Sequence, residues 1–295
     1  MVFASDRFID FRYIDFKCMN PVPIYLENHG NQKIYVGCGK CYHCLQKRRK
    51  EWYVRNLVEL LFSSNVFCTF VTLTYSDEHV PAQGVVKSHL QKFLDRFRKR
   101  LQRNFSVDTR YFAVSEYGDT TGRPHYHLLL YHNKELGIID YQEQLNEAWP
   151  YSQLEIDWHM LEPGSISYVC NYVLSYVFSE RTGKSKPFML SSRRPAIGSA
   201  FFGSEYENSA YRGDFLNFQI NEFKYSLPRY FRDRILSDDT KYDMVETYLD
   251  RLEETCERNS RKFLSKNRYI DFRLLLSKSR SFINDLKFQK SKHKL

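Results

Sequence analysis

The sequence lacks the features of a membrane-bound or secreted protein. No apolar run approaches the roughly 18 residues that a membrane span requires. The N-terminus also lacks the positively charged and then apolar pattern of a secretory signal. We therefore expect an intracellular protein with no membrane partner.

Internal repeats, long low-complexity linkers and an intact phosphate-binding loop are absent as well. Gly183-Lys184-Ser185 ends like such a loop, but Phe178 stands where the loop requires its first glycine. No strand-like segment precedes it, as the loop would require. We therefore predict no ATP site and no helicase activity.

Cysteine is scarce, and its placement is uneven. Three of the seven cysteines form a Cys-x-x-Cys-x-x-Cys motif at Cys38, Cys41 and Cys44, and Cys18 lies upstream. The odd count and the clustering favour reduced, metal-binding thiols over a disulfide framework. Four thiolates are the ligand set of a closed structural zinc site, for which His43 is a substitute ligand. Free thiols and an iron–sulfur cluster are the alternatives.

Positive charge and aromatic rings are abundant. Lys and Arg outnumber Asp and Glu by 44 to 35, which gives a formal net charge of +9 and a pI near 9.1. Aromatic residues make up 16% of the chain. Basic charge favours an anionic partner, and aromatic rings suit stacking on unpaired bases, although most of these rings belong in a core. Nucleic acid is the leading candidate partner.

Apolar periodicity predicts both strands and helices. Strands are expected over 66–75, 110–117, 124–131 and 153–158, and helices over 42–62, through Leu90–Leu101, over 140–148, and from Ser165 or Ser167 to about 180. Glycines between the second and third strands favour a hairpin. This order predicts an α+β fold, an antiparallel sheet with helices packed against one face.

The chain divides into four segments on the same grounds. We expect a Cys-rich N-terminal segment with a basic helix over 1–62 and a catalytic core over 63–186. A Phe- and Tyr-rich extension follows over 187–234, and a basic helical tail over 235–295.

The sharpest chemical signal is the pair His125 and His127. Residues two apart in a strand point to the same side, so the two imidazoles can share one divalent metal ion while Tyr126 faces away. A hairpin turn centred between Thr120 and Thr121 would place Glu116 opposite His125 as a third ligand. The alternative is a pair of surface histidines on an edge strand.

Tyr168 and Tyr172 form a second signal. With Tyr176 they make a stripe at helical spacing on one helix. Core packing explains most such stripes, but a phenol can also attack a phosphodiester and store the bond energy in a phosphotyrosine ester. Two tyrosines one turn apart could alternate as nucleophile and acceptor.

Short motifs spread over most of the chain form a specific set. They are the Cys-Gly-Lys-Cys-x-x-Cys-Leu cluster with Trp52 after it, Thr72-Leu73-Thr74-Tyr75, Glu116-Tyr117-Gly118, the Thr121–His127 segment, the Tyr168/Tyr172 pair, Pro187-Phe188, Ser192-Arg193, Pro195, Ile197-Gly198 and Leu227-Pro228-Arg229-Tyr230. Together they resemble the replication initiation proteins of microviruses, in particular the gokushovirus branch.

That resemblance implies the HUH endonuclease superfamily, whose core is a ferredoxin-like palm. It implies that His125 and His127 hold Mg²⁺ or Mn²⁺, with Glu116 as the candidate third ligand. Tyr168 and Tyr172 become the nucleophiles of a rolling-circle nickase. Such an enzyme cuts one strand at the origin, leaves a free 3′-hydroxyl and a 5′-phosphotyrosine link, and later religates the strand.

The partners implied are single-stranded and origin DNA, and then a host helicase and replication machinery in the bacterial cytoplasm. Candidate DNA contacts are Lys47, Arg48, Arg49 and Arg123.

The chain departs from the family pattern at one point. Related initiators often carry Lys three residues after each tyrosine, whereas this chain has Asn171 and Ser175. A cation there would neutralise the scissile phosphate, so its absence leaves open which tyrosine is primary. Lys184 or Lys186 is a substitute.

Two other functions compete with the phage nickase. A plasmid-type relaxase or single-tyrosine transposase shares the metal chemistry, but the paired tyrosines and the cysteine cluster argue against it. A zinc-stabilised nucleic-acid-binding protein would bind DNA without cutting it. A tyrosine-dependent protein–DNA adduct separates the enzymes from this binding protein.

Overall fold

The computed structural model describes residues 18, 20–26, 32–118, 120–173, 183–212, 217–237 and 240. The chain forms two compact units, and each is described by itself: Arg48–Phe231 (with Leu295), and Met1–Lys47 together with Arg232–Lys294. Most of the expected helical tail over 235–295 lies outside the described residues. The four-segment division therefore stays a prediction.

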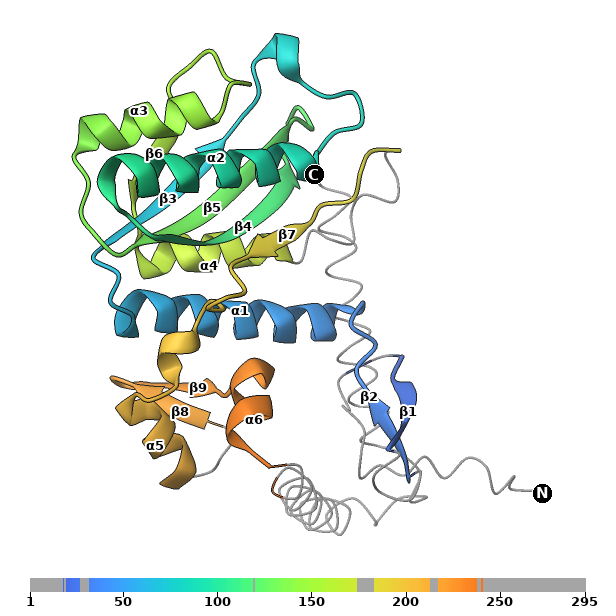
Figure 1. Ribbon diagram of the computed structural model, residues 1–295. Coiled ribbons are helices and arrows are strands. Elements are labelled where there is room, and N and C mark those ends of the chain that lie inside the picture. The colour runs from blue at the N-terminus through green and yellow to red at the C-terminus, as the bar shows by residue number, and fades with distance from the viewer. Residues whose placement is uncertain are drawn as a thin grey trace. The chain divides into compact units, whose positions relative to one another are not determined.

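A five-stranded antiparallel sheet forms the centre of the unit Arg48–Phe231 (Figure 1). Its spatial order is β6-β3-β5-β4-β7. The strands are β3 (Phe67–Leu73), β4 (Thr109–Tyr117), β5 (Pro124–His132), β6 (Asp157–Met160) and β7 (Met189–Ser191). This arrangement confirms the predicted α+β class and antiparallel sheet.

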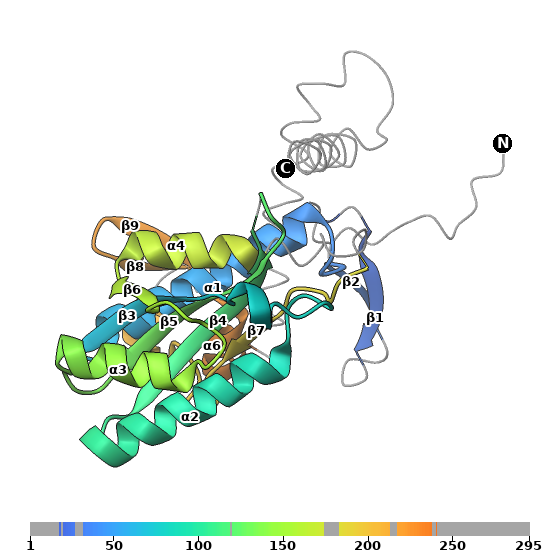
Figure 2. The ribbon, with the colours of Figure 1, turned by 90° about the horizontal axis from the view of Figure 1, so that it is seen from above.

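Helices cover both faces of this sheet, so the prediction of helices on one face is wrong. On one face lie α2 (Lys87–Phe105) and α3 (Ile138–Ala148), and on the other lie α4 (Pro163–Asn171) and α1 (Tyr42–Phe62), as Figures 1 and 2 show. The physical reason lies in β5, the middle strand. Leu128 and Leu130 pack in one apolar cluster, and Leu129 and Tyr131 pack in the other. A strand that is apolar on both sides must be covered on both sides.

The amphipathic pattern of α2 is confirmed. Its buried side chains are those of the predicted stripe, Leu90, Phe93, Leu94, Phe97 and Leu101. α4 begins earlier than predicted, because Pro163 occupies its first turn and Glu162 the capping position. The fixed backbone angle of proline suits the first turn of a helix, so the expected caps Ser165 and Ser167 lie inside it.

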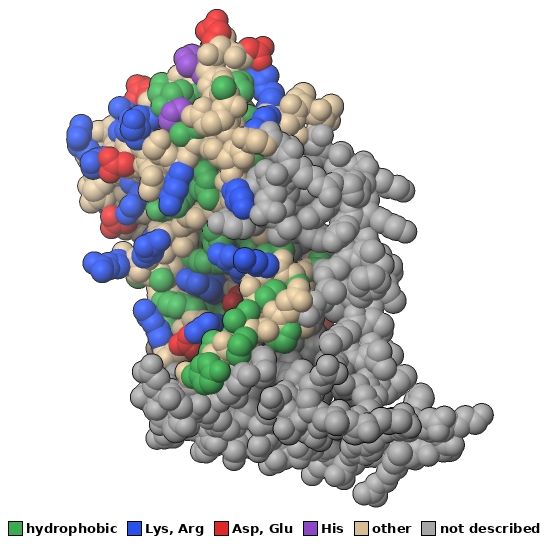
Figure 3. Space-filling view, turned by 90° about the vertical axis from the view of Figure 1, so that its right-hand side faces the viewer, with side chains coloured by type: hydrophobic (Ala, Val, Ile, Leu, Met, Phe, Trp, Pro, Cys, Tyr) green, Lys and Arg blue, Asp and Glu red, His purple; other side chains and the backbone are tan. Residues whose placement is uncertain are grey.

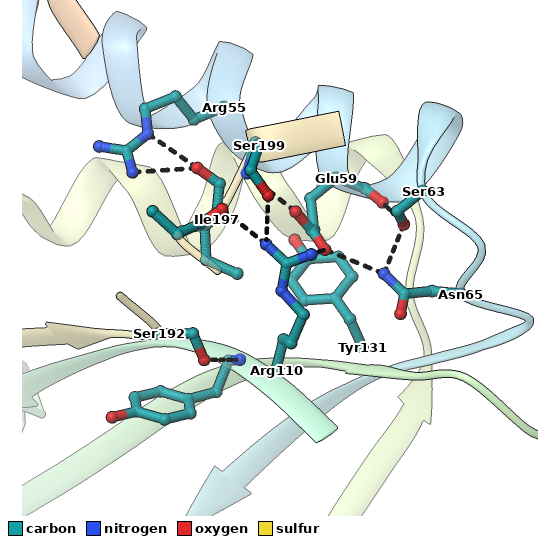
Figure 4. A network of polar contacts seen from close by, with 12 residues as sticks. Arg55, Glu59, Ser63, Asn65, Arg110, Tyr131, Ser192, Ile197 and Ser199 are labelled. Carbon is teal, nitrogen blue, oxygen red and sulfur yellow. Dashed lines mark hydrogen bonds and ion pairs between the residues drawn. The ribbon is translucent and has the colours of Figure 1, made fainter. Parts of the chain in front are cut away.

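A buried polar network fastens α1 to the sheet and to the segment that follows β7 (Figure 4). The Glu59 carboxylate of α1 is fully buried, lies 2.9 Å from Arg110 Nη1 on β4, and accepts the backbone N–H of Gly198 at 2.8 Å. Burial raises the pKa of Glu59, against the lowering effect of Arg110. Arg55 donates to the carbonyl of Ile197. These contacts fix the position of α1.

Small elements complete this unit. They are the 3-10 turns Asp77–His79 and Ser199–Phe201, α5 (Glu205–Arg212), β8 (Asn217–Ile220), β9 (Phe223–Ser226) and the start of α6 (Arg229–Ile235). The buried rings of Phe201, Phe218 and Phe231 pack together there. No helix among the described residues is long and apolar enough to cross a membrane.

The other unit contains a two-stranded hairpin of β1 (Val22–Leu26) and β2 (Gln32–Val36). Sequence reasoning missed β1, since Pro23 argues against a strand and the apolar side chains of Val22, Ile24 and Tyr25 are exposed rather than buried. Cys38 and its neighbours follow β2 directly.

Candidate functional site: the histidine hairpin and the tyrosine helix

The β4–β5 hairpin has the register that the sequence predicted. Glu116 pairs opposite His125, and Val114 pairs opposite His127. The turn is closed by hydrogen bonds from Gly118 N to the Arg123 carbonyl at 2.9 Å and from Gly122 N to the Gly118 carbonyl at 2.8 Å. Tyr126 points to the opposite face, where its side chain is fully buried.

His127 is held from both ring nitrogens. Its Nε2 lies 2.9 Å from Glu116 Oε1, and its Nδ1 lies 3.2 Å from the hydroxyl of Thr72 on the neighbouring strand β3. A carboxylate only accepts hydrogen bonds, so Nε2–H donates to Glu116, and in the neutral ring Nδ1 accepts from Thr72. Only 5% of the residue is exposed, which leaves the ring little freedom to turn.

His125 lies one register step further toward the turn. Burial lowers its pKa, while the Glu116 charge acts in the opposite direction. An added Cβ on Gly118 would lie 3.0 Å from His125 Cε1, so the glycine leaves room for the ring. Two imidazoles and a carboxylate on one sheet face are a donor set that suits a divalent cation. Glu116 and His127 are in contact, whereas His125 does not converge with them on a single point.

Tyr168 and Tyr172 of the α4 segment lie beside His127. Their ring centroids are 5.5 and 5.0 Å from that of His127, and the Tyr172 ring stacks on it at an interplanar angle of 16°. The Tyr172 hydroxyl donates to the Tyr168 hydroxyl at 2.5 Å. Tyr168 is 47% exposed. The structure therefore brings the two predicted tyrosines and the predicted histidine together, with one phenol open to solvent.

Three residues at this site were not predicted from the sequence. Thr72 orients His127, Phe70 packs between the rings of His127 and His159, and His159 Nε2 lies 3.3 Å from the Ser165 hydroxyl of α4. All come from β3 and β6, which pair with each other and, through β3, with β5. The Thr72-Leu73-Thr74-Tyr75 motif was the available signal, but only the strand pairing shows its contact with His127.

The predicted DNA contacts lie in different places. Arg49 donates to the Asn171 side chain, and Arg48 approaches the Met189 sulfur at 3.5 Å. Arg123 pairs with Asp77 and donates to the Tyr75 carbonyl at 2.7 Å. Lys47 is an exposed residue of α1. Figure 3 shows Lys and Arg side chains scattered over one face rather than gathered into one patch.

The two lysines considered as substitutes for the missing cation follow residues that the structure leaves undescribed. Lys184 donates to the Gly122 carbonyl at 3.0 Å and lies 5.3 Å from the Tyr117 ring centroid. It is thus placed at the turn of the histidine hairpin. Tyr176 and Ser175 lie outside the described residues.

The four predicted cysteines form a second site, in the unit that contains the N-terminus. The sulfurs of Cys18, Cys38, Cys41 and Cys44 all lie within 4.8 Å of one another. A tetrahedral zinc ion with Zn–S bonds of about 2.3 Å places its sulfurs about 3.8 Å apart. Cys18 Sγ and Cys41 Sγ lie 3.8 Å apart, so the spacing fits such an ion.

Backbone N–H groups also point at these sulfurs. Those of Lys40 and Cys41 donate to Cys38 Sγ, and that of Cys38 donates to Cys18 Sγ. Burial alone would raise the pKa of Cys38, but hydrogen bonds to its sulfur bring it down to about 7. Burial raises the pKa of Cys18 to about 11. This cysteine group can hold a metal ion such as zinc.

Comparisons with known proteins point in one direction. A family model for replication-associated proteins of the ORF2 type matches residues 68–176, which include the histidine hairpin and both tyrosines. The replication-associated protein ORF4 of Chlamydia phage 1 is 28% identical over 70% of this chain and 55% of its own length. The replication-associated protein VP4 of Bdellovibrio phage phiMH2K is 28% identical over 66% of each chain.

A third relative and a solved structure complete the picture. The replication-associated protein ORF2 of Spiroplasma virus 4 is 27% identical over 81% of this chain and 78% of its own length. The chain therefore spans just over half of the Chlamydia phage relative and more of the other two. The protein ORF119 of Sulfolobus islandicus rod-shaped virus 1 aligns with 40% of this chain and 89% of its own, at 20% identity and a TM-score of 0.27, too low to carry an argument. The three phage relatives and the family model together place the chain in the microvirus-type family of phage replication-associated proteins.

Proposed function

We propose that this protein is a rolling-circle replication initiator that nicks one DNA strand at the origin and later religates it. The observation that carries the proposal is the contact of two tyrosine hydroxyls, one of them exposed, beside a histidine fixed by Glu116 and Thr72. The family model covers this whole constellation. Replication-associated relatives make DNA the expected partner.

The reaction that fits the site is a transesterification. The oxygen of Tyr168 or Tyr172 forms a bond to the scissile phosphorus, and the bond from phosphorus to the 3′-oxygen breaks. The phenol loses its proton, and the departing 3′-oxygen takes one up. The product is a 5′-phosphotyrosine ester and a free 3′-hydroxyl, and attack by a 3′-hydroxyl on the ester reverses the step.

The hydrogen bond between the two tyrosines supports shared use of the pair. The Tyr172 hydroxyl donates to Tyr168, so the Tyr168 oxygen gains a donor that stabilises negative charge on it. Tyr168 is also half exposed, whereas Tyr172 stacks on His127. We therefore propose Tyr168 as the first nucleophile and Tyr172 as its partner.

His125, His127 and Glu116 are the residues that would hold Mg²⁺ or Mn²⁺. A divalent cation there would polarise a phosphate oxygen. Thr72 holds the His127 ring in one orientation, as supporting residues do for metal-binding histidines. Cys18, Cys38, Cys41 and Cys44 would hold a structural zinc ion, so Cys41→Ser should lower the zinc content measured on the purified protein.

The test is adduct formation on circular single-stranded DNA of the parent phage with Mn²⁺. Wild type should form a protein–DNA adduct that resists boiling in detergent, Tyr168→Phe should slow it strongly, and Tyr168→Phe with Tyr172→Phe should abolish it. The matched control is Tyr141→Phe, since Tyr141 is a fully buried tyrosine on the opposite face of the sheet. Binding without adduct under either divalent metal would favour a non-catalytic nucleic-acid-binding protein instead.

A further inference from the structure

Arg49 of α1 reaches the tyrosine helix. Its Nη1 donates to Asn171 Oδ1 at 2.6 Å, across 122 residues of sequence. Asn171 lies three residues after Tyr168 and directly before Tyr172, so it belongs to the helix surface that carries both phenols. A guanidinium is thus held next to the proposed nucleophiles.

The position of Arg49 is fixed from two sides. Glu59 and Arg55, further along α1, anchor the helix to β4 and to the segment after β7. Arg48 and Tyr172 line the same small pocket, which shows that this end of α1 adjoins the second tyrosine. The guanidinium therefore does not depend on a flexible loop for its placement.

The charge of Arg49 is not spent on a carboxylate. Among the residues that the structure describes, its partner is the neutral amide of Asn171, and none of the ion pairs there includes it. One of five guanidinium donors is used, so the others remain for a ligand. A planar guanidinium matches the oxygens of a phosphate group, and the side chain is only half-buried.

We propose that Arg49 binds the non-bridging oxygens of the scissile phosphate and that Asn171 positions it. The inference rests on the proposed nicking function. Attack by the tyrosine oxygen increases negative charge on those oxygens, and a fixed cation beside them stabilises the transition state more than the ground state. The competing explanation is structural, with the Arg49–Asn171 hydrogen bond only docking α1 against α4.

The test compares single-turnover adduct rates at saturating DNA, with binding measured separately. Arg49→Gln should slow the reaction by about a hundredfold while changing DNA affinity little. Arg49→Lys should retain part of the rate. The matched control is Lys50→Gln, which removes the same charge from an exposed neighbour on α1 and should react like wild type.

Two further measurements separate catalysis from docking. Adding Asn171→Lys to Arg49→Gln returns a cation to the tyrosine helix without restoring the hydrogen bond, and it should recover at least about tenfold in rate. A methylphosphonate at the cleavage site removes the phosphate charge, so the deficit of Arg49→Gln should shrink there. A wild-type rate in Arg49→Gln, or an equal deficit on both substrates with no rescue, would overturn the proposal. Absence of an adduct even in wild type would instead overturn the nicking function on which it rests.

Discussion

Two histidines of β5 have similar neighbours and different surroundings. His127 contacts Thr72, Tyr168 and Tyr172, and His132 contacts Thr109 and Tyr141. Five residues apart in a strand, they face opposite sides of the sheet. A histidine, a threonine and a tyrosine in contact therefore occur twice in this protein, once beneath α4 and once among α2 and α3.

The difference lies in charge and access. His132 and Tyr141 are fully buried, and their hydrogen-bond partners are neutral hydroxyls. Burial lowers the pKa of His132 to about 3, so the ring stays neutral and serves the core. His127 has the Glu116 carboxylate instead, and its neighbour Tyr168 is open to solvent. A carboxylate and an exposed phenol distinguish the candidate site from a packed polar cluster.

The strongest way to break this comparison is to exchange the two histidines' roles in an assay. His127→Gln should lower the rate of adduct formation by about a hundredfold, since it removes a proposed metal ligand beside the tyrosines. His132→Gln should leave the rate per folded molecule unchanged and lower the melting temperature. Single-turnover kinetics and thermal unfolding of both variants check this, and equal rate losses would erase the proposed distinction.

Acid stability sharpens the comparison next. The pKa of His132 is about 3 in the folded protein and about 6.5 in an unfolded chain, so the unfolded state binds the extra proton between those values. Stability from this group is complete above pH 6.5 and falls as the pH drops toward 3, by about 1.4 kcal/mol per pH unit. Urea unfolding between pH 7 and pH 5 should show a shallower pH dependence for His132→Gln than for wild type. Parallel curves would contradict a neutral buried His132.

The smallest expected effect concerns Tyr141. Its hydroxyl bonds Thr69 at 2.5 Å and His132 at 3.2 Å, so Tyr141→Phe removes buried hydrogen bonds and should cost about 1–3 kcal/mol of unfolding free energy. Tyr168→Phe, at an exposed position, should cost less than about 0.5 kcal/mol. Urea unfolding checks both, and a larger loss for Tyr168→Phe would mean that this phenol is structural.

Local patterns allowed much of the fold and site to be predicted. The hairpin register that sets Glu116 opposite His125 followed from the turn, and the buried stripe of α2 followed from helical periodicity. Contacts between distant segments did not follow. Thr72 meets His127 only because β3 pairs with β5, and Arg49 meets Asn171 only because α1 packs on the face that α4 shares.

The coverage of both sheet faces was missed for a related reason. The apolar run Leu128–Tyr131 looks the same whether one side or both sides of the strand are buried. A pattern in one segment cannot show which helices pack on each side, because their partners lie far away in sequence.

The most direct test of the central claim is to locate the DNA link on the protein. The adduct formed with Mn²⁺ is digested with protease and nuclease, and the modified peptide is identified by mass spectrometry. Our account predicts a nucleotide on Tyr168, with Tyr172 modified when Tyr168 is replaced by Phe. A link to any other residue, or none at all, would contradict it.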